Sequence, residues 1–426
     1  MKKNMIIICL LLSVVLLSSC SGKAAVTEPD DVSEGTEDVE LTLWTFPVGG
    51  WGNPTTVSNI LTSFHKEYPN IHISVEYLKY DNGDEKVKQA VSNGGAPDLV
   101  LEGPERLVAN WGEQGWMVDL SDLWESEQAG TIYENVREAC QYRNGAYYEV
   151  PICMTAHCMA INYDMFRDAD ALQYIDEESH TWTTEGFIQA VHALNAKGQE
   201  NAGIIYCKNQ TGDQGTRALV NNLYGGGFTD EAHTTYTVDS EENRKALQLL
   251  YELEGINFEP TLTSADAISL FSQKETAMCF CWNASVEVQQ TLNGNLDFDV
   301  FPMAFPTNGD APKLQGGIWG FGILDSGSSK RIEAAKTFIR YITENDAAYT
   351  RAVRASYYWP VRPMDNIYEN DMVMTEYSIF MPYMDDYYQI TPRWALARTA
   401  WWQMLGKVGA GANIAKALKD FPSIDF

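Results

Sequence analysis

The chain has 426 residues, of which 45% are hydrophobic and 21% are charged, and this composition excludes a largely disordered protein. Its length leaves room for two or three domains. The formal net charge of −28 at pH 7 disfavours nucleic acid and anionic lipid head groups as partners, because an acidic surface repels both.

The N-terminus has the pattern of an export signal. Lys2 and Lys3 precede an apolar run from Met5 to Leu17, which is too short to anchor a folded protein across a bilayer. The run ends in Leu-Ser-Ser-Cys, and this order of features resembles a bacterial lipoprotein signal. The resemblance implies that residues 1–19 are removed and that Cys20 is acylated. A short membrane anchor that stays uncut is the alternative.

Residues 20–39 are expected to form the lipidated end and a flexible tether, because positions 21–38 are small, polar and acidic without apolar periodicity. Removal of residues 1–19 takes away two lysines and no acidic residue, so the formal charge moves from −28 to −30. No second apolar stretch of the sequence approaches membrane-spanning length. Membrane contact should therefore come from the lipid alone.

Strand and helix patterns alternate in the first part of the folded chain. Residues 40–46 and 71–78 alternate like strands, and residues 55–66 place apolar side chains at helical spacing. A helix at 83–92 and a short apolar strand at 98–101 follow. This alternation predicts an α/β layer with a largely parallel sheet, where ligands meet the carboxyl ends of the strands.

Residues 148–166 are expected to cross from one half of the molecule to the other as an extended segment. Pro151 removes a backbone donor and favours extended geometry at Val150. Residues 162–164 then offer a turn, and an amphipathic helix opens at 181–185, so a new folded unit begins there. One internal strand of a single domain is the alternative.

A set of motifs occurs in a fixed order along the chain. They are Phe64–Ile73, Gly94–Val100, Trp111–Leu120, Tyr148–Pro151 with Ile161–Asp164, Thr181–Phe187, Phe271–Met278 ahead of Trp282, and Phe301–Pro306 followed by Gly316–Leu324 and Glu333–Phe338. Together they resemble the maltose-type extracellular solute-binding proteins of sugar ABC importers. The resemblance covers nearly the whole chain from about residue 40, although Lys274 and Glu275 stand where a Gly-Lys pair is usual.

The resemblance implies an α/β, two-lobed clamp of the type II periplasmic-binding-protein kind, with discontinuous lobes and a ligand cleft between them. One lobe would consist of residues 40–150 and 304–341, and the other of residues 151–303 and 342–426. Chain crossings near residues 151 and 304 would then act as hinges that close the lobes around a ligand.

Catalytic motifs are missing from the sequence, including those of nucleophile elbows, zinc proteases, P-loops, dinucleotide-binding turns and EF-hands. Glu102 and Glu105 are the best candidates for two-carboxylate glycoside hydrolysis, but two acids so close in one loop seldom flank one bond. Arg106 could donate to a ligand hydroxyl or simply balance these acids. A protein that is not an enzyme and uses no cofactor or metal is therefore expected.

Six cysteines remain outside the signal and the lipidation site: Cys140, Cys153, Cys158, Cys207, Cys279 and Cys281. An even number outside the cell permits disulfides, but apolar strand-like surroundings favour buried free thiols slightly. The spacing does not suggest a metal site, because no C-x-x-C pair is present.

Aromatic side chains are the main candidates for ligand contact, because sugar C–H faces stack on rings while hydroxyls bond to polar groups. Trp44 and Trp51 flank a strand-end loop and Trp282 follows a strand, which are typical cleft positions. Tyr224 precedes three glycines that would let a ligand approach closely, or would serve a tight turn. A core position is the alternative for each ring.

The resemblance implies further site residues. Trp394 matches the tryptophan of a W-x-x-x-R-T-A helix start that stacks on sugar in maltose-type proteins, and Trp282 matches a second cleft tryptophan. Glu105 and Arg106 match an acidic-basic pair of the cleft. Thr155 stands where an acidic cleft residue is usual, which argues against a maltodextrin ligand.

His157 in the first crossing and Trp319 in the returning strand complete the predicted site, although His157 could equally be structural. The sequence thus predicts a monomeric lipoprotein on the extracellular face of the cell membrane. It would capture a carbohydrate, such as an oligosaccharide, and deliver it to the membrane permease of an ABC importer. A surface glycan-binding or sensory lipoprotein of the same fold is the first alternative, and a glycoside-processing enzyme the last.

Overall fold

The computed structural model describes residues 37–80, 82–208, 212–365, 367–385 and 387–421. The described residues from Asp38 onward belong to one compact unit. The predicted signal at 1–19, the predicted lipidation site Cys20 and most of the predicted tether lie outside the described residues. Within the described part of the chain, none of the helices combines the length and apolar character needed to cross a membrane.

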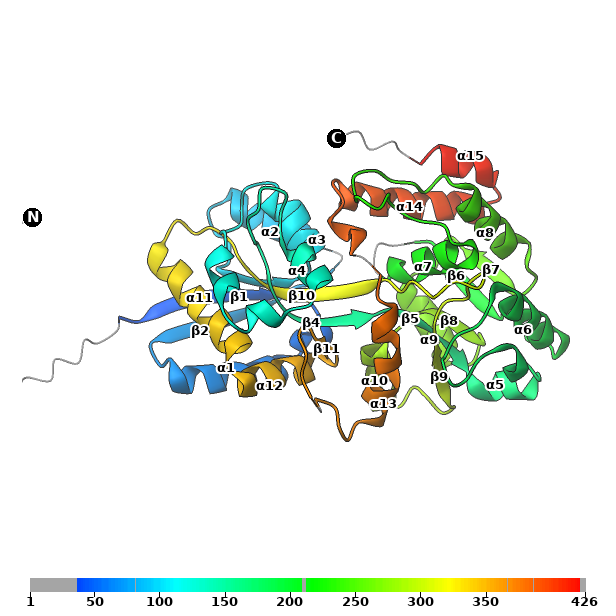
Figure 1. Ribbon diagram of the computed structural model, residues 1–426, viewed down its shortest axis with the longest axis horizontal. Coiled ribbons are helices and arrows are strands. Elements are labelled where there is room, and N and C mark those ends of the chain that lie inside the picture. Colours follow the sequence, from blue (N-terminus) through cyan, green and yellow to red (C-terminus); the bar gives the residue numbers. More distant parts are fainter. Residues whose placement is uncertain (1–36, 81, 209–211, 366, 386, 422–426) are drawn as a thin grey trace, which may run out of the picture. The chain divides into compact units, whose positions relative to one another are not determined.

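A six-stranded sheet forms the first lobe, with the strand order β11-β4-β10-β3-β1-β2 (Figure 1). Its strands are β1 Val39–Thr45, β2 Ile71–Tyr77, β3 Leu99–Glu102, β4 Val150–Ala156, β10 Gly316–Ile323 and β11 Trp359–Pro360. β1 pairs in parallel with β2 and β3, as the sequence predicts. The sheet is nevertheless mixed, because β10 runs antiparallel to both β3 and β4, and β11 antiparallel to β4. The prediction of a largely parallel sheet is therefore wrong for this half of it.

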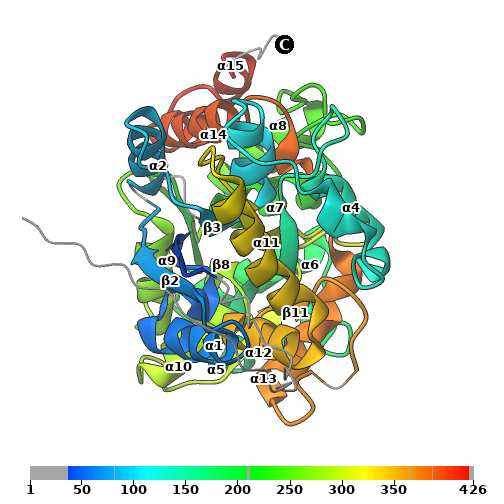
Figure 2. The ribbon, with the colours of Figure 1, turned by 90° about the vertical axis from the view of Figure 1, so that its left-hand side faces the viewer.

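Helices cover the first-lobe sheet, and α1 shows why they form. Asn53 caps the backbone N–H groups of Thr55 and Thr56, Pro54 opens the helix, and its inner face buries Phe64 against a ring of α11. Figure 2 shows α1 and α12 next to each other and α11 in front of the sheet, in agreement with their contacts. The helical segments of this lobe are η1 Gly49–Gly52, α1 Pro54–Glu67, α2 Gly83–Ser92, α3 Pro104–Arg106, η2 Leu107–Gly112, η3 Ser121–Glu125, η4 Ala129–Thr131, α4 Glu134–Cys140, α11 Ser329–Glu344 and α12 Asp346–Ser356.

The second lobe contains a three-stranded sheet of order β8-β5-β9 and a parallel pair of β6 and β7. The strands are β5 Cys158–Asn162, β6 Gly203–Tyr206, β7 Ile256–Glu259, β8 Met278–Trp282 and β9 Val300–Met303. Its helical segments are α5 Tyr163–Asp168, η5 Leu172–Tyr174, α6 Thr184–Ala196, α7 Asp213–Tyr224, α8 Glu241–Glu252, α9 Ser264–Ser272, α10 Ala284–Leu292, α13 Met372–Tyr377, η6 Ser378–Tyr383, η7 Tyr388–Ile390, α14 Trp394–Gly409 and α15 Ile414–Lys419. The two-lobed α/β architecture is thus confirmed.

The predicted extended crossing at 148–166 forms two consecutive strands. β4 lies in the six-stranded sheet and β5 in the three-stranded sheet, so the chain changes sheets at His157. The segment 304–315 returns from β9 to β10, and the backbone N–H of His157 donates to the Gln315 carbonyl at 2.9 Å. The two crossings therefore lie side by side, and the extended part ends where Asn162 caps α5.

Candidate functional site

One arginine gathers three carboxylates where the first-lobe strand β3 ends. Glu102 is the last residue of β3, and the next residues turn into α3, which carries Glu105 and Arg106. The Arg106 guanidinium donates to Asp84 through Nε at 2.7 Å and Nη2 at 3.0 Å. Its Nη1 donates to Glu102 at 2.8 Å and to Glu105 at 3.4 Å. These residues and Glu149 are called the acidic cluster below.

Burial in the acidic cluster favours protonated carboxyl groups. Desolvation raises the pKa of Glu102 to about 8, although Arg106 opposes the shift, so burial favours the protonated form of this carboxyl. Glu149 is fully buried, and burial together with the charges of Glu105 and Glu102 raises its pKa well above the usual value. Among the described residues, neither carboxyl oxygen of Glu149 has a hydrogen-bond partner. The cluster therefore holds unused acceptor capacity.

Aromatic groups border the acidic cluster. The Arg106 guanidinium lies over the rings of Phe46 and Tyr80, at 5.0 and 5.5 Å from their centroids. The hydroxyl of Tyr387, just before η7, donates to Glu105 at 2.6 Å. This contact links the first lobe to the C-terminal part of the chain, which also bonds β10 through Gln389 Nε2 and the Gly316 carbonyl at 3.1 Å.

A second group of charges lies where α7 and α14 of the second lobe meet, and is called the basic cluster. It consists of Asp213, Arg217 and Arg398. Arg398 donates to Asp213 through Nη2 at 2.8 Å and Nε at 3.3 Å, and Arg217 forms an ion pair with the same carboxylate one helical turn away. Burial lowers the pKa of both arginines.

Aromatic rings enclose Arg217, whose side chain is fully buried. Its guanidinium lies 4.7 Å from the centroid of Trp394, 5.4 Å from Phe228 and 5.7 Å from Tyr388. Its Nε donates to the Tyr388 hydroxyl at 3.0 Å. Trp394 therefore orients an arginine of the basic cluster, while its own Nε1 has no partner among the described residues.

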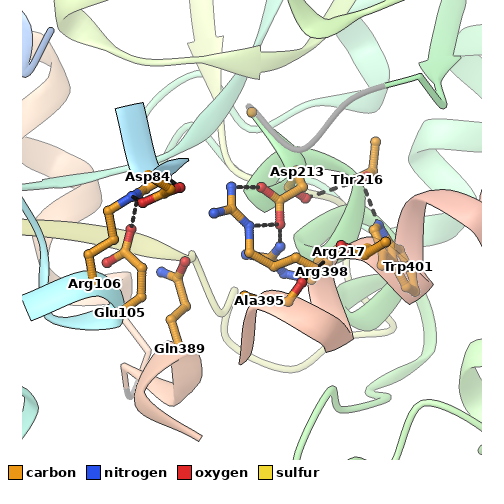
Figure 3. Close-up of polar contacts among 12 residues, drawn as sticks. Asp84, Glu105, Arg106, Asp213, Thr216, Arg217, Gln389, Ala395, Arg398 and Trp401 are labelled. Atoms are coloured by element: carbon orange, nitrogen blue, oxygen red, sulfur yellow. Dashed lines mark hydrogen bonds and ion pairs between the residues drawn. The ribbon is translucent and has the colours of Figure 1, made fainter. Parts of the chain in front are cut away.

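The two clusters lie within electrostatic reach of each other. The pKa of Arg398 is set first by burial and then by the charges of Arg106, Glu105 and Asp84. Figure 3 shows the acidic residues Asp84 and Glu105 with Arg106 on one side and the basic cluster on the other. The structure thus brings hydrogen-bond acceptors of the first lobe and donors of the second lobe toward one region.

Thr155 lies in β4, and His157 lies where the chain passes from β4 to β5. Burial, assisted by the charge of Arg217, lowers the pKa of His157 to about 4, so this imidazole is neutral at pH 7. Its Nδ1 is 3.3 Å from Asn283 Nδ2, whereas Nε2 has no partner among the described residues. The Thr155 hydroxyl is buried and is 3.4 Å from the Ala156 carbonyl.

Two predicted tryptophans occupy core positions in this conformation. Trp282 is fully buried, and its Nε1 donates to the Tyr377 hydroxyl at 2.7 Å and to Glu287 at 3.4 Å. Trp51 is also fully buried, and its Nε1 donates to the Ala352 carbonyl at 3.2 Å. Their contact with a ligand stays a prediction, and neither lies in the two charged clusters.

The remaining predicted rings lie elsewhere. Trp319 stacks on Tyr358 with centroids 4.6 Å apart. Lys86 Nζ lies 5.3 Å from the centroid of half-buried Trp44, and Lys245 Nζ lies 4.0 Å from that of Tyr224 at the end of α7. The structure therefore unites Glu102, Glu105 and Arg106 in one cluster, and places Trp394 and His157 near the other.

Sequence reasoning missed several residues of the two clusters, namely Asp84, Glu149, Asp213, Arg217 and Arg398, and also Tyr387, which contacts the acidic cluster. A signal existed for Arg398, because it is the arginine of the same W-x-x-x-R-T-A motif that supplies Trp394. Asp213 and Arg217 have ion-pair spacing on a helix, which is too common a pattern to mark a site. Asp84 and Tyr387 meet the cluster only through tertiary contacts.

The cysteines and the acidic groups suggest no metal centre. All six cysteines outside the N-terminal region are buried and free, which confirms the prediction of free thiols. In the part of the chain that the structure describes, no group of three histidine, cysteine, aspartate or glutamate residues could hold a metal ion.

Comparisons with known proteins agree with this architecture. The model of the bacterial extracellular solute-binding protein family matches residues 52–349. A solute-binding protein of an ABC transporter from Thermotoga lettingae, solved with alpha-D-tagatose, is 18% identical with a TM-score of 0.72, covering 90% of this chain and 97% of that chain.

Two further solved structures are similar. An ABC substrate-binding protein from Listeria monocytogenes in complex with cycloalternan is 19% identical with a TM-score of 0.69, covering 90% of this chain and 97% of that chain. A maltose/maltodextrin-binding domain from Bdellovibrio bacteriovorus, bound to maltotriose, is 16% identical with a TM-score of 0.67 and the same two coverages, 90% and 97%. At these identities the likeness shows the fold.

Proposed function

The chain belongs to the bacterial extracellular solute-binding proteins, and we propose that it captures a carbohydrate between its lobes and delivers it to the membrane permease of an ABC importer. Solved proteins of the same fold support the choice of ligand, since one holds tagatose, another cycloalternan and a third maltotriose. An oligosaccharide is the class that we favour.

The proposal is carried by one observation, which is that the acidic cluster and the basic cluster lie on two sides of one region. A sugar hydroxyl donates one hydrogen bond and accepts others, so a sugar site needs carboxylates and guanidiniums in one place. Glu105, Arg106 and Arg398 each keep about a tenth of the side chain exposed, namely 12%, 10% and 11%. They can therefore reach a ligand while their neighbours hold them in position.

The same geometry supports binding without catalysis. Glycoside hydrolysis needs two carboxyl groups on opposite sides of one bond. Glu102 and Glu105 instead accept from the same nitrogen, Nη1 of Arg106, so both lie on one side of any ligand. We propose no cofactor for this role.

A thermal-shift screen of the mature chain against mono- and oligosaccharides tests the proposal. A ligand that binds only the folded state at a hundredfold excess over its Kd stabilises the protein by about 2.7 kcal/mol. For a sugar found in this way, Arg398→Met should raise the Kd at least tenfold, whereas Arg340→Met, at an exposed ion pair on α11, should not. A screen without any stabilising saccharide would contradict the proposal.

We also propose that the lobes move about the two neighbouring crossings, at His157 and at 304–315. The lobes would follow the predicted division, except that β4 and β11 move with the six-stranded sheet to which they belong, and α12 moves with the same lobe. Closure buries more of a ligand than an open cleft can. Small-angle scattering should show a smaller radius of gyration when the identified sugar saturates the protein, and an unchanged profile would indicate a rigid site.

Lipidation of Cys20 would hold a monomer on the extracellular face of the cell membrane, close to the permease. The Leu-Ser-Ser-Cys sequence behind an apolar run supports this part of the proposal. In cells labelled with a fatty acid, Cys20→Ala should abolish the label on this protein. Labelling at the level of the unchanged protein would place the anchor elsewhere.

A further inference from the structure

A separate polar cavity of about 470 Å³ lies on the second lobe, beside the end of α7. Cavities that hold small ligands in proteins have volumes of about 300–1,000 Å³. The walls come from the loop after α7 and from the crossing segment 304–315, which are far apart in the sequence. None of the residues named above as members of the two charged clusters lines it.

The walls of the cavity are held in place by specific contacts. Asn222 Oδ1 accepts from the backbone N–H of Lys313 at 2.8 Å, and its Nδ2 donates to the Lys313 carbonyl at 2.8 Å. In the loop after α7, a Cβ at Gly226 would meet Asn243 Oδ1 at 2.1 Å, so glycine fits best there. The cavity is therefore preformed by the fold.

Polar groups of acidic character line the cavity. The lining contains four carboxylates, those of Asp230, Glu231, Asp310 and Asp385. It also contains the ammonium group of Lys313. The side-chain oxygen of Asn221, which also belongs to the lining, is buried and has no partner among the described residues. This lining favours ligands that donate hydrogen bonds and repels anionic ones.

The cavity adjoins the region of the two clusters through shared residues. Tyr388 lines the cavity, and its hydroxyl accepts from Arg217 of the basic cluster at 3.0 Å. Gln315 lines it as well, and its carbonyl accepts from the His157 backbone at 2.9 Å. A ligand in the cavity would thus lie next to a ligand held by the clusters.

We propose that this cavity is a second saccharide-binding region, which takes neutral or amino-substituted sugar units of a longer ligand and rejects uronate units. The class of ligand rests on the proposed function, whereas the place and the charge preference rest on the cavity. Its contribution grows with the length of the saccharide, because a single sugar unit held by the two clusters does not reach it.

Titration calorimetry with saccharides of increasing length tests the inference. The probes are neutral malto- and xylo-oligosaccharides, chitosan oligosaccharides and oligogalacturonates, each with its monosaccharide. The exposed Ala311 at the cavity lining is changed to Trp, which fills the space, and the equally exposed Ala347 on α12 of the first lobe is changed to Trp as a control. Circular dichroism checks that both variants fold.

We expect Ala311→Trp to raise the Kd of the longer neutral or amino saccharides at least tenfold and to leave monosaccharide binding unchanged, with Ala347→Trp like the unchanged protein. If Ala311→Trp misfolds, a second variant with its own control tests the inference. The double change Asp310→Asn with Glu231→Gln should reduce the preference for chitosan oligosaccharides over oligogalacturonates at least fivefold, while Glu67→Gln, on the exposed end of α1, should not.

The outcomes separate this inference from the proposed function. If the unchanged protein binds long saccharides and the cavity variants bind them equally well, the inference is overturned and the proposed function stands. Tighter binding of oligogalacturonates than of the other probes would also overturn it. If no saccharide binds the unchanged protein, both proposals fail together.

Discussion

The acidic cluster of the first lobe and the basic cluster of the second lobe pair their charges in opposite ways. In the acidic cluster one guanidinium, Arg106, serves three carboxylates, and the charges of Glu105 and Glu102 act on a fourth carboxyl, Glu149. In the basic cluster one carboxylate, Asp213, serves two guanidiniums. Excess acid can take up protons, whereas excess arginine cannot lose them. The acidic cluster therefore has an adjustable charge and the basic cluster a fixed one.

The largest effect should come from removing the central ion of each cluster. Asp213→Asn leaves two arginines in a buried site, and the free energy of unfolding should fall by about 3–5 kcal/mol, the loss seen when a buried ion pair is broken. Arg106→Met should have a smaller effect, because the freed carboxyls can become neutral. Urea denaturation at pH 7 measures both variants, and equal losses would remove the distinction between the clusters.

The next-largest loss of stability should come from removing the aromatic ring that packs on the basic cluster. Trp394 packs on Arg217 and is almost fully buried, so Trp394→Ala should lower the free energy of unfolding by about 3 kcal/mol, within the range for core tryptophans. Trp282→Ala should behave alike for the same reason. The burial of both rings differs from the expectation that they line an open cleft. Removing a ring from an open cleft would cost little stability.

Thermal denaturation with calorimetric titration of an identified sugar separates stability from binding in these variants. Trp124 is a packing control, since it stacks on Tyr147 and its Nε1 donates to the Glu149 carbonyl. Trp124→Ala should lose stability without an effect on affinity at temperatures where it is folded. A melting temperature of Trp394→Ala close to that of the unchanged protein would show that the ring is not needed to hold Arg217.

Of the two clusters, the acidic one should contribute to the pH dependence of stability. The pKa of Glu102 is about 8 in the folded chain and 4.5 for an ordinary glutamate, so its stabilising proton is fully present below about pH 4.5. Between these values only the unfolded chain ionises, and the free energy of unfolding falls as pH rises, by at most about 1.4 kcal/mol per pH unit for one group. Above about pH 8 this fall ends.

Glu102→Gln removes one titrating group and should reduce the fall in stability between pH 5 and pH 8, which is measured by urea denaturation at several pH values. Glu149→Gln should act in the same direction, because burial raises the pKa of this carboxyl as well. Glu178→Gln, at an exposed position of the second lobe, is the matched control. A slope that is unchanged in both cluster variants would assign the titration to other groups.

The smallest effect concerns the contact between the acidic cluster and the C-terminal part of the chain. Tyr387→Phe removes the hydroxyl that donates to Glu105 at 2.6 Å, and should lower the free energy of unfolding by about 1 kcal/mol. It should also weaken sugar binding, because Glu105 loses a group that orients it. Tyr251→Phe, at an exposed ring on α8, should change neither quantity in the same two assays.

Much of the fold could be predicted from local patterns. The helices at 55–66 and 83–92 and the strands at 40–46 and 71–78 appear within one or two residues of their predicted bounds, because apolar spacing and the Asn53 cap act locally. The direction of β10 could not be predicted in this way. It pairs with β3 after a separation of more than two hundred residues, and only the return of the chain from the second lobe decides its direction.

The sequence by itself determined the elements, the order of the motifs and three members of the acidic cluster, since Glu102, Glu105 and Arg106 are close neighbours at one strand end. Only the tertiary structure decided that Asp84 and Tyr387 join them, and that Arg217 and Arg398 share Asp213. The burial of Trp282 and Trp51 was decided in the same way. The physical reason is that charge pairing and burial depend on distances in space, which neither the spacing nor the type of residues along one segment can specify.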